Sequence, residues 1–279
     1  MLRLVRRELT LYFGSPSNVF MSLLGALISF ILYLVFLQHN LEQNFTHVVN
    51  GQAVLDFWLL SGTIAVAGIT TTFTGMSLFV RDLESGTIAD FLVSGVSKVK
   101  IRLSYLISTY IIGVLMQLIV FIVIFSYFAS VDQITLSSAQ IGHTVGLILF
   151  TSVLWVILNA LLTLPVKNSD TLGRIGSIIG TAAGFFTTVY IPVGTLSRGA
   201  QNIIGLTPAP YVSTLFRQVL IPQSSLPSDI KDLLGLTFTI NRVTLESFSV
   251  LVLIVAAFLF VYAAFLGVAV LRRRDSNMI

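Results

Sequence analysis

Arg81–Arg102 reads RDLESGTIADFLVSGVSKVKIR and separates two long apolar runs. Seven of its 22 residues are charged. A charged residue at the centre of a bilayer costs about 2.5–3.5 kcal/mol, whereas a good apolar residue returns only about 0.3–0.6 kcal/mol. The charged residues of this segment would therefore cancel most of the insertion energy of a span, and we expect the segment to stay outside the hydrocarbon.

The middle of this charged segment has a helical pattern. Ile88, Phe91 and Leu92 share one face of a helix. Thr87, followed three residues later by Asp90, predicts a capping box that opens the helix. We expect a short amphipathic helix at the membrane surface. Its apolar face would point away from the bilayer and form a contact surface. The alternative is a surface helix that lies flat in the headgroups.

Composition places the whole chain in a membrane. The 279 residues are 55% hydrophobic and only 10% charged, with a mean hydropathy of +0.94, whereas soluble domains carry about 25% charged residues. The chain contains no cysteine, which excludes disulfides, thiolate nucleophiles and cysteine metal sites. We therefore expect an all-α integral membrane protein that forms a single transmembrane domain over residues 1–279.

The apolar runs predict six transmembrane helices. Their expected ranges are 19–37, 54–80, 103–128, 139–164, 172–191 and 248–270. An apolar stripe predicts an N-terminal interfacial helix within 1–16. Six spans place both termini and the segment 81–102 on one side, which carries 12 of the 16 basic residues. The positive-inside rule makes this side the cytoplasm, so the net charge of +4 reports topology and not a nucleic-acid partner.

The long segment 192–247 does not resemble a free loop. Residues 211–221 carry apolar side chains at helical spacing between prolines. Such a helix is too short to cross a bilayer, so we expect a re-entrant pair of short helices that enters from outside. Residues 223–247 predict an exposed excursion with a further short amphipathic piece.

Catalytic and nucleotide-binding motifs are missing from the sequence. It contains no GxxxxGK[ST], HExxH or GxSxG motif, and its three histidines are far apart. His143 and Asp56 are the only pair that could form a polar site near one membrane surface. A membrane-embedded enzyme built on this pair is one alternative function, and a non-transporting immunity or sensor protein is another.

The polar residues near the middle of the predicted spans are neutral, and Asp56 lies near the outer end of the second span. Thr70, Thr74 and Gln117 suit either interhelical hydrogen bonds or a substrate path. The row of Gly176, Gly180 and Gly184, spaced by four residues, suits either close helix packing or a gate. The chain thus has a membrane body without an energy source of its own, which suggests that another polypeptide supplies the energy.

Two segments point to a known family. The first is RDLESGTI at Arg81–Ile88, and the second is LTPAPY at Leu206–Tyr211, which follows Pro192 and precedes Arg217. With this order of spans, the chain resembles the type-2 permease (transmembrane subunit) family of ATP-binding-cassette exporters, in particular the branch of drug and antibiotic exporters linked to drug resistance. The usual Asn before Pro is Thr207 here, the Leu-Pro-x-Trp element is absent, and the excursion at 223–247 is longer than the pattern predicts.

The resemblance implies a function and its partners. The chain would be an ABC transporter permease that exports an amphipathic drug, antimicrobial peptide or lipid-linked molecule by alternating access. It would work as a homodimer or heterodimer, with separate ATPase subunits that hold ATP and Mg, in the plasma membrane of a bacterium. Apart from membrane lipids, no further partner is implied. The chain itself would bind no cofactor or metal and would not be an enzyme.

The resemblance also assigns residues. A cytoplasmic coupling helix in 81–102 would contact the ATPase through Glu84, Gly86, Thr87, Ile88, Phe91 and Leu92. The translocation path would be lined by Thr70, Thr74, Gln117, Gly180 and Gly184. The outer gate would include Pro192, Pro208, Tyr211 and Arg217.

Overall fold

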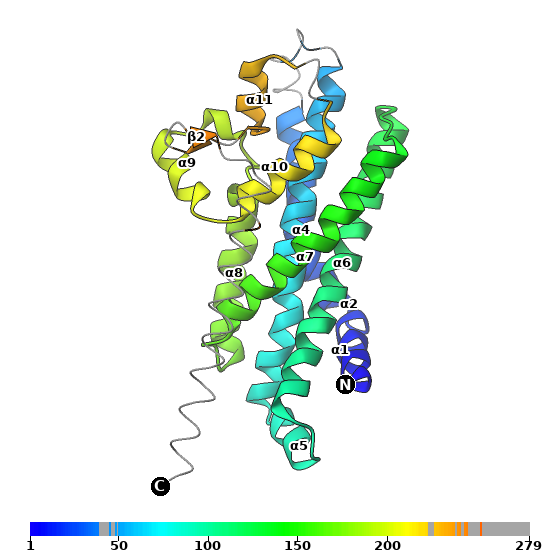
Figure 1. The fold of residues 1–279 in the computed structure, drawn as a ribbon, viewed down its shortest axis with the longest axis vertical. Coiled ribbons are helices and arrows are strands. Elements are labelled where there is room, and N and C mark those ends of the chain that lie inside the picture. The colour runs from blue at the N-terminus through cyan, green and yellow to red at the C-terminus, as the bar shows by residue number, and fades with distance from the viewer. Residues whose placement is uncertain are drawn as a thin grey trace.

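The computed structural model describes residues 1–38, 45, 48, 50–222, 226–237, 239–240, 243–244 and 252. Within these residues the chain is all-helical except for one two-stranded hairpin (Figure 1). Four of the described helices are long and apolar enough to cross a membrane. They are α2 with the adjoining π-helix η1 (Pro16–Leu37), α4 (Gly51–Glu84), α6 (Lys98–Val131) and α7 (Ser138–Thr163).

The predicted N-terminal helix is present as α1 (Leu2–Phe13), and its interfacial position stays a prediction. It ends at Gly14, and Pro16 occupies the first turn of α2 (Pro16–Leu32). Proline is tolerated there because a backbone N–H in the first turn of a helix would have no acceptor within the helix. The side chain of Ser15 caps α2 by accepting a hydrogen bond from the backbone N–H of Asn18. The chain then continues into η1 (Tyr33–Leu37).

The connection between α4 and α6 is shorter than the charged segment 81–102 that the sequence indicates. Helix α4 continues through Arg81 to Glu84, and α6 begins at Lys98. Only residues 85–97 therefore connect the two helices, with the short helix α5 (Thr87–Val93) between them (Figure 1). The charged residues cluster at the ends of two long helices, where they can leave the hydrocarbon while the helical hydrogen bonds continue.

Helix α4 is the centre of the bundle. It packs against α2, α6, α7, α8 (Ser169–Phe186) and α10 (Ala209–Leu220), and nearly all of its apolar stretch is buried. Small residues permit this close packing. A Cβ on Gly68 would lie 2.5 Å from the Trp155 side chain, and one on Gly62 would lie 2.7 Å from Val189.

Helix α8 corresponds to the predicted span 172–191. It ends at Phe186 and lies outside the set of four candidate spans among the described residues. The predicted span at 248–270 falls outside the described residues, apart from Val252. Both assignments therefore remain predictions.

The segment after α8 forms short helices, as the sequence predicts. The 3-10 helix η2 (Val193–Thr195) is followed by α9 (Arg198–Gly205) and α10. The further amphipathic piece is α11 (Ser228–Leu234). The hairpin of β1 (Thr239–Ile240) and β2 (Val243–Thr244) was not expected from the sequence. A re-entrant position of these helices in the bilayer stays a prediction.

Candidate functional site

Two glycines define the limits of α5, the helix that protrudes at one end of the molecule (Figure 1). Gly86 precedes it with a φ of 82°, and Gly95 follows it with a φ of 80°. Other residues rarely adopt these left-handed angles. After α5, the N–H of Val96 donates to the carbonyl of Phe91 and that of Gly95 to Leu92, which is a Schellman motif. The polypeptide can therefore leave and rejoin the two long helices within few residues.

The predicted capping box at the start of α5 is wrong. Gly86 occupies the N-cap position, and Thr87 is the first helical residue. The Thr87 hydroxyl contacts the Ser85 hydroxyl at 2.9 Å. Glycine is found at this position because the chain needs a left-handed turn directly after α4, and that need outweighs the side-chain cap.

The apolar face of α5 has a different orientation from the one expected. Ile88, Phe91 and Leu92 are partly buried and pack on a cluster of buried residues from α1, α4 and α6. The three side chains therefore attach α5 to its own bundle instead of pointing away from it. The opposite face presents Asp90 and Val93 to solvent, with Val93 89% exposed.

An ion pair joins α1 to the end of α4 that leads into α5. The Arg7 guanidinium donates to both carboxylate oxygens of Asp82, at 2.7 and 3.2 Å. Tyr105 of α6 donates its hydroxyl to the same carboxylate. Arg7 also lies over the Phe91 ring, 5.3 Å from its centre. Bidentate pairs fix geometry more strongly than single contacts, so α1, α4, α5 and α6 are held as one unit.

A buried carboxyl lies next to this ion pair. Glu8 of α1 is fully buried. Ser104 donates to one of its oxygens at 2.9 Å, and Ser108 donates to the other. Burial raises the pKa of the Glu8 carboxyl to about 7, although the two serine hydrogen bonds and the nearby Arg7 charge oppose this shift and Asp82 adds to it. The protonation of Glu8 can therefore change near neutral pH.

The stability of the protein should fall as pH rises from about 4.5 to about 7. In this range the folded state binds the Glu8 proton more tightly than the unfolded state does, so the stabilisation is complete below pH 4.5 and lost above 7. The full change is roughly 3 kcal/mol at most. Thermal unfolding of the full chain in detergent measures it.

Glu8→Gln should remove this pH dependence, because the amide is neutral throughout the range. Asp90→Asn on the exposed face of α5 is the control and should preserve the wild-type profile. A Glu8→Gln profile that matches the wild-type profile would show that another group titrates.

A second contact links the α5 end of α4 to α8. The Glu84 carboxylate accepts the backbone N–H of Ser169 at 2.9 Å and also the Ser169 hydroxyl. Ser169 is the first residue of α8. A carboxylate at a helix N-terminus satisfies a free donor and favours the helix dipole. Glu84 is therefore placed to transmit a movement of α4 to α8.

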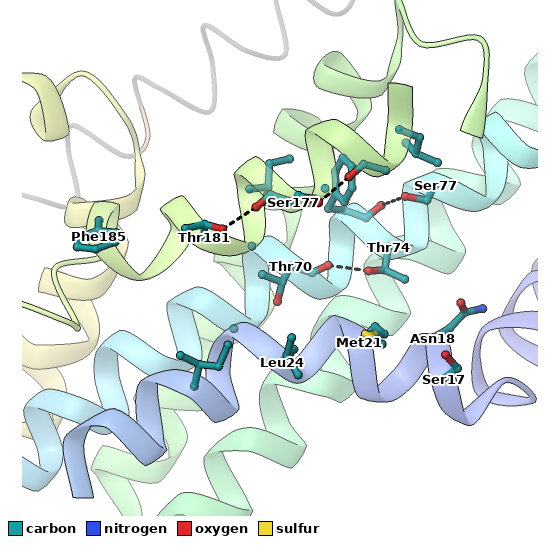
Figure 2. Close-up of a pocket in the computed structure, with 18 of the residues that line it drawn as sticks. Ser17, Asn18, Met21, Leu24, Thr70, Thr74, Ser77, Ser177, Thr181 and Phe185 are labelled. Atoms are coloured by element: carbon teal, nitrogen blue, oxygen red, sulfur yellow. Dashed lines mark hydrogen bonds between the residues drawn. The ribbon is translucent and has the colours of Figure 1, made fainter. Parts of the chain in front are cut away.

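A groove of about 1040 Å³ runs between α2, α4 and α8. Figure 2 shows residues of these three helices along its walls. Three of the predicted path residues line it, namely Thr70, Thr74 and Gly180. Nothing lies within 4 Å of a Cβ placed on Gly180, so this glycine leaves open space in the groove.

The other two predicted path residues lie elsewhere. Gln117 is fully buried and donates to the Ser152 hydroxyl at 2.7 Å and to the Gly113 carbonyl at 3.1 Å. It joins α6 to α7, which is the interhelical alternative that the sequence left open. Gly184 packs directly on the Tyr190 ring and is absent from the groove lining.

The predicted outer-gate residues gather around α10, at the end of α8 away from α5. Pro208 is the N-cap of α10, and the Tyr211 hydroxyl donates to the Gly205 carbonyl at 2.9 Å. Pro192 is buried and precedes η2. Arg217 is 1% exposed, which makes it one of the largest fully buried side chains.

Arg217 caps the C-terminal end of α8. It donates to the Thr187 carbonyl at 3.0 Å, and to the Thr188 carbonyl and hydroxyl at 3.2 and 2.9 Å. Its guanidinium also lies over the Trp58 ring at 5.4 Å. A cation is favourable there because the last carbonyls of a helix carry partial negative charge. Arg217 therefore connects α10 to both α8 and α4.

Sequence reasoning missed Glu8, Asp82 and Ser169 as parts of the assembly around α5. An acidic residue among apolar neighbours on the buried side of α1 was the only available signal for Glu8. Its serine partners lie about 100 residues away, so only the folded chain reveals the contact.

The pair proposed for an enzyme does not form one site in the described part of the chain. Asp56 is fully buried and accepts the Tyr33 hydroxyl at 3.0 Å, whereas His143 is exposed on α7. The described residues also contain no group of three or more His, Cys, Asp or Glu side chains that could hold a metal ion.

A comparison with known protein families gives a match over most of the chain. The model of a family described as "ABC-2 type transporter" matches residues 1–221. No curated protein and no solved structure matches the chain. The matched range includes α1, the charged segment with α5, the groove and α10.

Proposed function

Because this chain belongs to the ABC-2 type transporter family, and is thus a multi-pass transmembrane permease of an ABC transporter, we propose that it exports an amphipathic substrate by alternating access. Permeases of this family normally work with an ABC ATPase subunit. We propose that two permease copies, identical or different, assemble with two such subunits. ATP and Mg bind the ATPase, and both termini of the permease face the cytoplasm of a bacterium.

The attachment of α5 is the observation that carries this proposal. A short helix connects two long helices and is attached to them by its apolar face and by the contact of Phe91 with Arg7, while the Arg7–Asp82–Tyr105 contacts join α1, α4 and α6 beside it. A partner that moves α5 therefore moves α4 and α6 with it. Glu84 extends the same movement to α8. Rigid elements of this kind support switching between two states.

The α5 end suits docking through its exposed face. Asp90 and Val93 face outward, and we propose that this face enters the ATPase, while Ile88, Phe91 and Leu92 transmit the force. Gly86 and Thr87 set the turn that positions α5. We propose that the groove opens toward the interface of the two permeases, that α8 is the fifth span, and that residues 248–270 form the sixth. The short helices η2, α9 and α10 would be the re-entrant outer gate.

Asp82→Asn should uncouple ATP hydrolysis from transport. The amide cannot hold Arg7 as a bidentate ion pair, so α1 no longer follows α5, whereas the exposed docking face is unchanged. In proteoliposomes of the permease with its ATPase subunit, we expect ATP hydrolysis to continue and transport per ATP to fall about tenfold, because the lost charge-assisted hydrogen bonds contribute about 1.5–3 kcal/mol.

Asp170→Asn is the matched control, because Asp170 is an exposed carboxylate in the first turn of α8 with no part in the Arg7 contacts. An Asp82→Asn variant with wild-type transport per ATP would contradict the proposed route of force. A wild-type chain that never associates with an ABC ATPase would contradict the proposed function itself.

A further inference from the structure

The groove between α2, α4 and α8 has a polar end and apolar walls. Its lining includes one residue with a permanent charge, Arg81, in the last turn of α4. Ser17 and Asn18 line it from the first turn of α2. These three residues lie at the end of the groove nearest α5, because α2 begins and α4 ends there. Within the described residues, no hydrogen bond or ion pair engages the Arg81 side chain.

The middle of the groove offers few free hydrogen-bond donors. The hydroxyls of Thr74 and Ser77 on α4 donate to the carbonyls four residues earlier. Those of Ser177 and Thr181 on α8 do the same, and Figure 2 shows these bonds along the walls. Since their protons are already used, these side chains present methylene and methyl groups beside Leu24, Ile28 and other apolar residues.

No carboxylate lines this groove within the described residues, and Asp82, next to Arg81 in the chain, is paired with Arg7. Glu84 and Asp170 lie at the ends of α4 and α8, but neither lines the groove. The Glu84 carboxylate is engaged by Ser169. The charge inside the groove is therefore positive at one end and absent along its length. Its volume of about 1040 Å³ is at the upper end of the range of about 300–1,000 Å³ that is usual for sites of small ligands.

We propose that this groove binds an anionic amphiphile, with its acyl chain along α2 and α8 and its carboxylate or phosphate headgroup at Arg81. This inference rests on the proposed function and narrows the substrate to amphiphiles with a negatively charged head. An apolar chain replaces water along the walls, and the headgroup receives the guanidinium donors. A neutral amphiphile would offer the exposed Arg81 guanidinium no negative charge.

Photolabelling of the full chain tests this inference without the ATPase. The permease is placed in nanodiscs of phosphatidylcholine and labelled with a fatty acid that carries a diazirine at the chain end, or with the corresponding alcohol. We expect the acid to label residues of α2 and α8 in the groove. Arg81→Gln should weaken labelling by the acid about tenfold, because a charge-assisted hydrogen bond is lost. Labelling by the alcohol should not change. Arg174→Gln, an exposed arginine outside the lining, is the control.

A substitution that fills the groove provides an independent test. Gly180→Leu should reduce labelling by both probes, because its new side chain enters the open space. Gly146→Leu on α7 is the matched control, since a Cβ there also meets nothing within 4 Å but lies outside the groove. Equal labelling by acid and alcohol, or an unaffected Arg81→Gln variant, would overturn the inference and leave ATPase coupling untouched.

A second copy of the chain is the competing occupant. Because the chain has no cysteine, Thr181→Cys provides a unique reporter on the groove. Cross-links between copies at this position, together with loss of labelling by both probes, would show that protein fills the groove and would overturn the inference. Wild-type ATP-dependent transport of the labelled acid by Arg81→Gln in the complete transporter would overturn the assignment of the anion as cargo.

Discussion

Val93→Asp should strongly weaken binding of the permease to its ATPase subunit while leaving the permease folded. Val93 is 89% exposed at the end of α5, so an aspartate there disturbs no internal contact, and exposed substitutions usually change stability by less than about 0.5 kcal/mol. If α5 enters a cleft of the ATPase, the same carboxylate must lose its water without a partner. We expect binding to weaken at least a hundredfold, which is about 2.7 kcal/mol.

Titration of the detergent-solubilised permease with the purified ATPase subunit measures this effect, and thermal unfolding checks the fold. Leu206→Asp is the matched control, because Leu206 is 86% exposed between α9 and α10, at the opposite end of the molecule. Its binding should equal that of the wild type. Wild-type binding by Val93→Asp would place the docking surface elsewhere.

Phe91 belongs to the internal attachment of α5, unlike the exposed Val93. Phe91 packs on the chain's own helices and under Arg7, so Phe91→Asp should lower both the stability of the permease and its binding. An intact, fully active complex with Phe91→Asp would contradict the role of α5 altogether.

Arg217→Ala should destabilise the protein more than an alanine substitution of any other arginine in the described residues. It leaves the Thr187 and Thr188 carbonyls at the end of α8 buried without their donor. Each unsatisfied buried group costs about 1–3 kcal/mol, and the cavity beside Trp58 adds to this. We expect a loss of roughly 3–5 kcal/mol, measured by chemical unfolding of the full chain in mixed micelles.

Two further variants serve as comparisons for Arg217→Ala. Arg217→Lys should recover only part of the loss, because an ammonium lacks the planar fork whose two nitrogens reach the two carbonyls and the Thr188 hydroxyl. Arg198→Ala, on an exposed first residue of α9, should cost less than about 0.5 kcal/mol. An Arg217→Ala variant as stable as Arg198→Ala would show that α10 does not depend on the cap of α8.

The contrast between α5 and α10 shows how far a sequence pattern predicts orientation. Both have apolar residues at helical spacing, and both helices exist. In α10 the polar face is as buried as the apolar face, since Ser213, Thr214 and Arg217 all find partners inside the protein. In α5 the apolar face turns inward and leaves Val93 outside. Periodicity identifies a face but cannot say which neighbours cover it.

The sequence by itself determined the membrane class, the helical architecture of the described residues, the family and the approximate place of α5, because these depend on local hydropathy, on charge and on helical spacing. Only the tertiary structure decided which polar residues act together. The Glu8 carboxyl meets serines about 100 residues away, and Arg217 meets the end of α8 about 30 residues before it. Likewise, Thr70 and Thr74 line a groove that Gln117 does not reach. Each of these contacts depends on how helices distant in the sequence pack around α4, and no local pattern encodes that packing.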